Sequence, residues 1–243
     1  IPLSIGGNML TMFLLGKSFF LKNYEVLNTL AISKDKKYLA TGGGGWRGIS
    51  SIAFPRSFPI YIYNNVTQKR EFKLYGHYYK IKSLSFNHTG EFLASTAKND
   101  QYLKIWNLKT KKLVDIYYCS YNFINSIEYN PVNDTLAITN GLNVYLFDTK
   151  KDTAIILSQG RAPLKFNNDG NCVFFQDHNY NIVQYNIENK KIVNTFVGHN
   201  DIISSISLVD DCSRMVSSSW DGTVKLWDVT NGKEIVTFME RLK

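Results

Sequence analysis

The chain has 243 residues, 44% of them hydrophobic and 14% aromatic, and its formal net charge at pH 7 is +8. This is enough apolar material for the core of one domain or two. The many aromatic residues, with only five prolines, favour an all-β fold over a helical one. The three cysteines, Cys119, Cys172 and Cys212, are odd in number and far apart, which argues against a disulfide framework and against a metal site. We therefore expect an intracellular protein, cytoplasmic or nuclear, without a metal or cofactor.

The N-terminal segment, residues 1–25, contains the longest apolar run. This run covers residues 9–21, is interrupted by Lys17 and is too short to cross a bilayer as a helix. It has neither the preceding basic region nor the small-residue cleavage site of a signal peptide. Residues 10–15, followed by Gly16, have the pattern of a short outer strand, so the sequence predicts a strand there.

Five segments that follow share one pattern of short strands. In each, an apolar strand ends in an aromatic residue and a small polar one, and these aromatics recur at intervals of roughly 40 residues: Tyr63, Trp106, Phe147, Tyr185 and Trp227. A second marker, seen for example in SLSFN (83–87) and SISLV (205–209), keeps the same interval. The sequence therefore predicts four strands per unit and five units, at about 26–75, 76–119, 120–158, 159–197 and 198–239.

Units of four strands at this period are typical of the blades of a β-propeller. One twisted four-stranded sheet cannot cover its own apolar faces, so neighbouring sheets stack around an axis. A β-sandwich with evenly spaced strands is the alternative. Two independent markers in one register argue against it.

Repeats two and five resemble WD40 repeats. Gly76-His77 precedes Trp106-Asn107, Gly198-His199 precedes Trp227-Asp228, and residues 217–228 read SSSWDGTVKLWD. The other three repeats share only the period. The resemblance implies an all-β, WD40-type β-propeller with five recognisable four-stranded blades, and the function of a non-catalytic scaffold for protein–protein interaction in a multiprotein complex.

The same resemblance implies a hydrogen-bonded network of a His, a Ser or Thr, an Asp and a Trp in each of these two blades. A buried indole N–H needs an acceptor, a hydroxyl can relay, and a carboxylate can hold the imidazole. Two such sets at matching positions indicate a structural role rather than a catalytic triad, and we expect no catalytic residue. The predicted members are His77, Thr96, Asp100 and Trp106 in repeat two, and His199, Ser217, Asp221 and Trp227 in repeat five.

Repeats one, three and four depart from this pattern. At the Asp position they carry Ser57, Gly141 and Asn179, so we expect their blades to depend on packing. Repeat one also has a Gly-rich insertion at 42–57, whose G-x-G-x-x-G match lacks the helix that a dinucleotide site requires. We interpret the insertion as a surface loop, where binding functions often lie.

One face of the ring, which we call the top face, carries the turns between second and third strands and the segments that lead into the first strands. The family's contact positions lie there, and Trp220, directly before Asp221, has the character of a binding hot spot. Packing of Trp220 on a neighbouring loop is the alternative. Carried over to this sequence, the contact positions are Trp220, Ile202, Ser204, Lys80, Lys82, Asn99, Phe123, Asn125, Asn140 and His178.

The turns between third and fourth strands are rich in lysine, so basic residues gather on the opposite side of the ring. Such a girdle could meet phosphates of nucleic acid or an anionic surface, but lysines in hairpin turns also keep strands soluble. We call this set the basic rim: Lys69, Arg70, Lys109, Lys111, Lys112, Lys150, Lys151, Lys190, Lys191 and Lys233.

The leading hypothesis is a scaffold that holds a protein or peptide, acidic or phosphorylated, on its top face. A nucleic-acid or anionic-surface binder that uses the basic rim is one alternative, and the interaction part of a longer multidomain protein is another. Propellers have about four to eight blades, and repeat five has its own outer strand. The strand at 10–15 then belongs to a further blade, so we expect part of a larger ring of about six or seven blades, or a partner that completes it.

Overall fold

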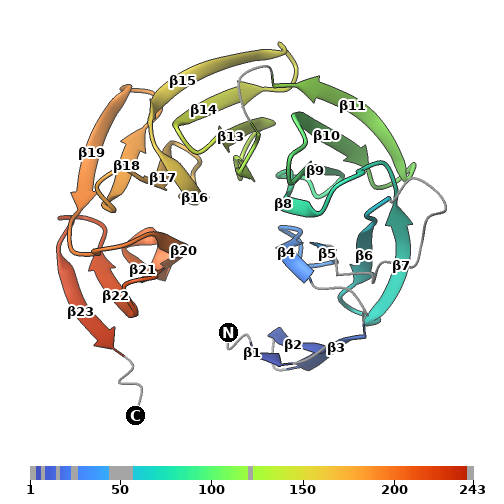
Figure 1. Ribbon diagram of the computed structural model, residues 1–243, viewed down its shortest axis with the longest axis horizontal. Helices are drawn as coiled ribbons and strands as arrows, with labels where there is room; N and C mark the ends of the chain where they lie inside the picture. The colour runs from blue at the N-terminus through green and yellow to red at the C-terminus, as the bar shows by residue number, and fades with distance from the viewer. Residues whose placement is uncertain are drawn as a thin grey trace.

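The computed structural model describes residues 4–6, 9–14, 17–22, 27–43, 57–119 and 123–239. Regular structure in these ranges is β-strand, apart from one 3-10 turn, η1 (Asp210–Cys212). The strands form six sheets, five of four strands and one of three. Figure 1 shows the four-stranded sheets following one another around a central axis, as the blades of a β-propeller, and this confirms the predicted fold class. Within the described part of the chain, no helix has the length and apolar character needed to cross a membrane.

Each blade consists of four consecutive antiparallel strands, with the first strand nearest the axis and the fourth on the outside (Figure 1). Blades one and two comprise β4 (Leu27–Ile32), β5 (Tyr38–Gly43), β6 (Ile60–Asn64), β7 (Lys69–Leu74), β8 (Ile81–Phe86), β9 (Phe92–Ala97), β10 (Tyr102–Asn107) and β11 (Lys112–Tyr118). Blades three to five comprise β12 (Ser126–Tyr129), β13 (Thr135–Thr139), β14 (Asn143–Asp148), β15 (Thr153–Gln159), β16 (Arg161–Phe166), β17 (Cys172–Gln176), β18 (Ile182–Asn186), β19 (Lys191–Phe196), β20 (Ile203–Val209), β21 (Arg214–Ser219), β22 (Thr223–Asp228) and β23 (Glu234–Met239).

The third and fourth strands are joined in the same way in every blade. A register shift interrupts each pair: it lies directly before the marker aromatic in four blades, and between Val144 and Tyr145, two residues before Phe147, in blade three. Such a bulge increases the local twist of a strand pair. The turns that join these strands each hold one residue with a positive φ, between 50° and 73°: Gln68, Lys111, Asp152, Lys190 and Gly232. All five blades therefore share one backbone design, although only one of these residues is a glycine.

Neighbouring blades bury their facing sides against each other. Between blades two and three, Leu103 and Ile105 pack in one buried cluster with residues of β12 and β13. Two hydrogen bonds reinforce the contact, because the backbone N–H of Ile127 donates to Ser83 Oγ (3.2 Å) and that of Tyr129 donates to Ser85 Oγ (2.8 Å). The first strand of blade three is thus attached to the first strand of blade two.

Blade five is uncovered on its far side. Ser205 and Ser207 hold the register positions of the two serines of blade two, yet both are exposed. Val224 is 38% exposed, whereas Leu103, at the matching place in β10, is fully buried. Packing between blades runs from β4 to β8, β12, β16 and β20, and among the described residues none of comparable extent joins β20–β23 to β4–β7. The ring is therefore open at this point (Figure 1).

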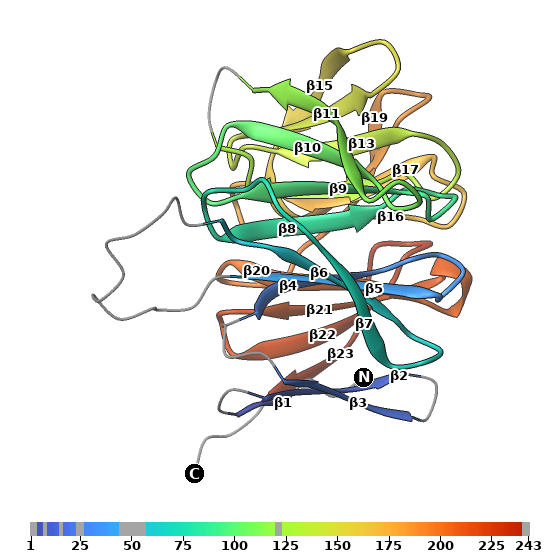
Figure 2. The same ribbon diagram turned by 90° about the vertical axis from the view of Figure 1, so that its right-hand side faces the viewer.

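The N-terminal sheet contains β1 (Ser4–Gly6), β2 (Met9–Leu14) and β3 (Lys17–Lys22). The sequence predicts a single outer strand at 10–15, whereas the structure has three strands, of which β2 covers residues 10–14. Residue 15, like most of the insertion at 42–57, lies outside the described residues. Figures 1 and 2 show this sheet next to β7, on the open side of the ring. That it belongs to a larger ring stays a prediction.

Candidate functional site

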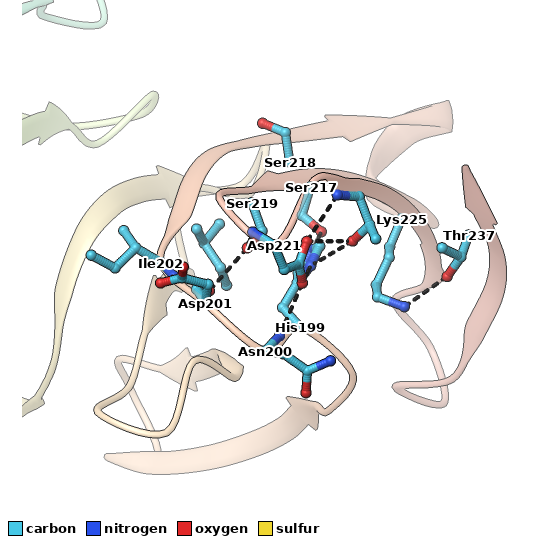
Figure 3. A network of polar contacts seen from close by, with 12 residues as sticks. His199, Asn200, Asp201, Ile202, Ser217, Ser218, Ser219, Asp221, Lys225 and Thr237 are labelled. Atoms are coloured by element: carbon cyan, nitrogen blue, oxygen red, sulfur yellow. Dashed lines mark hydrogen bonds and ion pairs between the residues drawn. The ribbon is translucent and has the colours of Figure 1, made fainter. Parts of the chain in front are cut away.

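In blade five, a Trp, a Ser, a His and an Asp are joined by hydrogen bonds. Figure 3 shows Ser217, His199 and Asp221 of this network. Trp227 Nε1 donates to Ser217 Oγ (2.8 Å), which lies 2.7 Å from His199 Nε2. The other ring nitrogen, Nδ1, lies 2.9 Å from Asp221 Oδ2. Ser217 accepts from the indole and contacts Nε2 through the same hydroxyl, while Nδ1 faces the carboxylate, so an Nδ1–H would donate to Asp221. The structure thus brings together all four residues predicted for repeat five.

Asp221 also fixes the turn between β21 and β22. Its carboxylate accepts from the backbone N–H of Asn200 (2.9 Å) and from both N–H and Oγ1 of Thr223 (2.9 and 2.6 Å). Burial alone raises the pKa of Asp221, but the hydrogen bonds from Thr223, Asn200 and His199 outweigh it and hold the pKa well below its usual range. In addition, the N–H of Trp220 donates to the carbonyl of Ile202 (2.9 Å). The turn that carries Trp220 is therefore rigidly held.

Blade two has the same network, with one correction to the prediction. His77 Nδ1 lies 3.1 Å from Asp100 Oδ2, and its Nε2 lies 2.7 Å from a serine hydroxyl that also accepts from Trp106 Nε1 (2.7 Å). That serine is Ser95, not the predicted Thr96. The Thr96 hydroxyl is buried and has no hydrogen-bond partner.

The length of the β9–β10 turn explains this difference. Ser95 is paired with Lys104 in the same way that Ser217 is paired with Lys225, so the two serines are equivalent. The turn of blade two has one more residue before its Asp than the turn of blade five. Counting back from Asp100 by the spacing of blade five therefore ends one residue too late. Since neighbouring residues of a strand point to opposite faces, Thr96 lies on the wrong face.

The glycine before each network histidine is required by the indole. A Cβ atom on Gly76 would lie 2.9 Å from Trp106 Cη2, and one on Gly198 would lie 3.2 Å from Trp227 Cη2. Real Cβ atoms rarely come this close to another atom, because cores are packed to contact. The Gly-His and Trp motifs therefore depend on each other sterically.

Blades one, three and four have no such network among the described residues. At the Asp position, Ser57 and Asn179 are exposed and Gly141 has a φ of +88°. Where blades two and five have serine, the strand register places Thr41, Ile138 and Phe175. These blades are held by apolar packing instead. No group of three or more His, Cys, Asp or Glu side chains that could hold a metal ion is present in the part of the chain that the structure describes.

The ten predicted contact residues differ in how much of them solvent can reach. The segments leading into the first strands are joined to the turns between second and third strands by bonds such as Lys98 N–H to Lys80 O (2.7 Å) and Trp220 N–H to Ile202 O, so both belong to the top face. Trp220 is 71% exposed and Phe123 is 47% exposed. Exposed as well are Lys82, Asn99, His178 and Ser204, while Ile202, Lys80, Asn125 and Asn140 are half-buried.

Several of these side chains are already engaged. Asn140 Oδ1 accepts two backbone N–H groups of its own turn, His178 Nδ1 lies 2.7 Å from Arg161 Nη2, and Ser204 Oγ lies 2.8 Å from Ser218 Oγ. Lys82 is the skipped residue of a register shift in β8, which directs it outward. Blades three and four separate it from Trp220, so one ligand would have to reach across the axis to meet both (Figure 1).

Two exposed aromatics of the top face were not among the predicted contacts. Tyr78 and Tyr79 are 61% and 49% exposed and lie directly after Gly76-His77, in the segment that leads into β8. The sequence contains a signal that could have identified them, because the residues that directly follow the Gly-His pair belong to the top face in both WD40-like repeats. Tyr78 and Tyr79 add aromatic surface near Asn99 on blade two.

All ten residues of the basic rim are exposed, in or beside the turns between third and fourth strands. Some are engaged: Lys150 Nζ lies 3.1 Å from Asp134, Lys151 Nζ lies 3.2 Å from Asp148, and Arg70 and Lys111 lie over aromatic rings. Exposed ion pairs contribute little to stability, so phosphates could compete for these groups. Because Asp134 and Asp148 neutralise part of the charge of Lys150 and Lys151, the net positive charge of the basic rim is lower than its lysine and arginine residues alone indicate.

Acidification is expected to destabilise the fold through His77. Burial lowers the pKa of His77 below its ordinary value of 6.5, against the opposing hydrogen bond to Asp100. Below about pH 6.5 the unfolded chain therefore takes up a proton that the folded chain does not. The free energy of unfolding then decreases as the pH is lowered. Urea unfolding at about pH 7.5 and about pH 5.5 should show this fall, and a smaller fall for His77→Gln. Equal falls for both proteins would contradict the assignment.

Comparison with known proteins identifies a repeat in two segments of the chain and solved structures with the same fold. The family model described as "WD domain, G-beta repeat" matches residues 68–107 and 190–228, which contain the third strands of blades two and five. COMPASS component SWD3 of Saccharomyces cerevisiae is 26% identical over 113 residues, 44% of this chain and 36% of that protein. CCR4-associated factor 4 homolog of Vanderwaltozyma polyspora is 27% identical over 166 residues, 67% of this chain and 21% of that protein. The matched regions thus span 36% and 21% of the lengths of these two relatives.

Among solved structures, the β-propeller domain of Cps50 (Swd1) from Myceliophteria thermophila has the same fold. The TM-score is 0.71 at 13% sequence identity, and the superposition covers 90% of this chain and 73% of that one. At this identity the likeness concerns the fold alone.

Proposed function

Because two blades of this β-propeller match the WD40 repeat model, we propose that the chain is a non-catalytic scaffold that binds protein partners through the top face of its ring. One relative is by name a component of the COMPASS complex, which is consistent with a place in a multiprotein assembly. The His, Ser and Asp side chains that resemble a catalytic triad form hydrogen bonds within the structural network. Ser95 and Ser217 are 0% and 1% exposed, so neither hydroxyl is accessible to a substrate.

The observation that carries the proposal is Trp220, which is 71% exposed on a turn that cannot easily move. Ordering a flexible turn on association costs binding free energy, and a turn that is already held does not incur this cost. Aromatic side chains with polar surroundings are the usual anchors of protein interfaces. The network of blade five thus supports binding by holding the turn that carries Trp220.

The kind of partner follows from charge. Lys80 and Lys82 lie on blade two of the same face, next to the exposed Tyr78 and Tyr79. Acidic or phosphorylated segments would gain charge-assisted contacts with these lysines. Because blades three and four separate this site from Trp220, we propose an extended partner that crosses the ring or one partner at each site.

The test is affinity capture with quantitative mass spectrometry from source cells, at physiological salt. Truncation of a hot-spot residue costs about 2 kcal/mol or more, so Trp220→Ala should deplete the main partners at least roughly tenfold. Lys82→Glu should deplete acidic or phosphorylated partners, and phosphatase treatment of the extract separates these two classes. Lys111→Glu with Lys112→Glu, on the basic rim, is the control and should leave these partners bound. Unchanged capture with Trp220→Ala would remove the top-face proposal.

The second candidate, binding of nucleic acid or an anionic surface by the basic rim, is favoured by one observation. Ten exposed basic residues recur at equivalent turns of the five blades. Phosphate binding weakens steeply with salt, so RNA or DNA binding that falls between low and physiological salt, and is lost in the Lys111→Glu, Lys112→Glu variant, would support it.

The wider context is proposed on the same basis. Since the curated relatives are longer than the matched region, we propose that these blades act as the interaction part of a larger assembly, with a ring completed by a further blade or by a partner. All three cysteines are free thiols, as suits an intracellular site in the cytoplasm or the nucleus.

A further inference from the structure

Blade three contains a cavity that none of the surfaces above uses. Its volume is about 260 Å³, and it lies between the end of β11 and strands β13 to β15. Ile124, Ile138 and Phe147 form its buried part, being 2%, 6% and 7% exposed. Ala154 and Asp152 are lining residues that solvent can reach. The cavity therefore has an apolar interior and an opening at the surface.

The cavity lies where blades two and five place their network. By strand register, Ile138 takes the position of Ser95 and Phe147 that of Trp106. Cys119, which also lines the cavity, precedes its blade as Gly76 precedes blade two. A side chain at Gly76 would collide with Trp106 Cη2, and the smaller ring of Phe147 has no such atom. Blade three thus has no counterpart of the indole that reaches this place in blades two and five.

Blade four fills the same place in another way. Phe175 takes the serine position there and is 1% exposed. It lies so close to Gly160 that a Cβ on this glycine would be 2.5 Å from the Phe175 ring. Among blades two to five, blade three alone combines an aliphatic residue at the serine position with a phenyl ring at the tryptophan position. This combination leaves space unfilled.

Two of the polar groups around the cavity already have partners. Asn140 Oδ1 accepts from the backbone N–H groups of Leu142 and Asn143, and Tyr117 Oη donates to the carbonyl of Thr149 (2.9 Å). The carboxylate of Asp152 lines the opening and can accept from a guest N–H there, whereas a charged guest would lose its hydration in the apolar interior. An apolar guest loses nothing, and an apolar cavity of about 150 Å³ is large enough to hold benzene. Chemistry and size therefore favour an aromatic ring larger than benzene.

We propose that this cavity is a binding site for an indole-sized aromatic ring, supplied by a free aromatic molecule or by a tryptophan side chain of a partner. The guest lies beside Phe147, in the space near Cys119 that corresponds to the one that the Cη2 end of Trp106 reaches, toward Gly76, in blade two. Its ring packs on Phe147 and Ile138, beside the Cys119 thiol. The site is separate from Trp220 and the basic rim, so it stands independently of the proposed function.

The experiment is isothermal titration of the purified chain with indole and, separately, with N-acetyltryptophanamide. The wild-type chain should bind indole at one site. Ala154→Trp places a ring in the opening and should weaken binding at least tenfold. Ile155→Trp is the matched control, because Ile155 is on the same strand, 50% exposed, and does not line the cavity. It should bind as the wild type does, and thermal melts confirm that both variants fold.

Alkylation of the thiols gives an independent readout. Indole should slow the modification of Cys119, and should leave that of Cys212, which does not line the cavity, unchanged. Binding of both compounds would assign the site to a partner's tryptophan, and binding of indole alone would assign it to a free aromatic molecule. Absence of indole binding to the wild type, or equal binding to Ala154→Trp, would overturn the proposal.

Discussion

Replacing Trp227 with alanine is expected to lower the free energy of unfolding by about 3–5 kcal/mol, while replacing Trp220 is expected to change it by less than about 0.5 kcal/mol. The two residues belong to the same blade. Trp227 is fully buried, packs edge-on against Phe196 (ring centroids 5.8 Å apart) and donates to Ser217. Trp220 is 71% exposed, so its truncation opens no cavity. The difference arises from burial, since the residue type is the same.

Chemical denaturation followed by circular dichroism measures both variants. Trp220→Ala is also the variant that should lose partners, so its unchanged stability would show that the loss is local to the surface. If Trp220→Ala destabilised the fold as strongly as Trp227→Ala, the indole would be packing on its neighbours and the proposed anchor would be wrong.

Replacing Ser95 with alanine is expected to cost about 2–4 kcal/mol. The hydroxyl is the partner of both Trp106 Nε1 and His77 Nε2, and a buried polar group left without a partner costs about 1–3 kcal/mol. Thr96→Val, one residue away, should be neutral or stabilising by up to about 1 kcal/mol, because it removes a buried hydroxyl that has no partner.

This pair separates the two assignments of the network serine or threonine. Unfolding in urea, with the slope compared between variants, gives both free energies. A large loss for Thr96→Val together with a small loss for Ser95→Ala would restore Thr96 to the network and contradict the structure.

The sequence predicted the blades well, because two repeated patterns report directly on strand geometry. An aromatic followed by a polar residue marks the end of each third strand, and Trp106 and Trp227 indeed occupy that place. All four predicted residues of blade five are joined in the network, because the spacing used for the prediction fits the turn of that blade. The prediction of Thr96 was wrong because the turn before Asp100 has one additional residue. The extra residue moves the residue chosen by counting to the opposite face of the strand, and the sequence of the strand does not reveal this.

Other features depend on three-dimensional neighbours and could not be predicted. The cavity of blade three exists because the side chains around it do not fill the space. Whether Phe147 and Ile138 fill it depends on how their blade packs against its neighbours. The separation of Lys82 from Trp220 depends on the order of blades around the ring. Similarly, short strands such as β1 (Ser4–Gly6) form by pairing, and their sequence pattern alone is too brief to identify them.

The uncovered side of blade five links partner binding to folding. In stacked repeats each unit is stabilised by its own contacts and by those with its immediate neighbours. Blade three has a neighbour on each side, whereas blade five is packed against blade four alone among the described blades. Local opening of blade five therefore breaks one interface rather than two, and such openings occur well below the free energy of global unfolding. A ligand that binds Trp220 binds only the closed blade, so it adds its binding free energy to the stability of that blade.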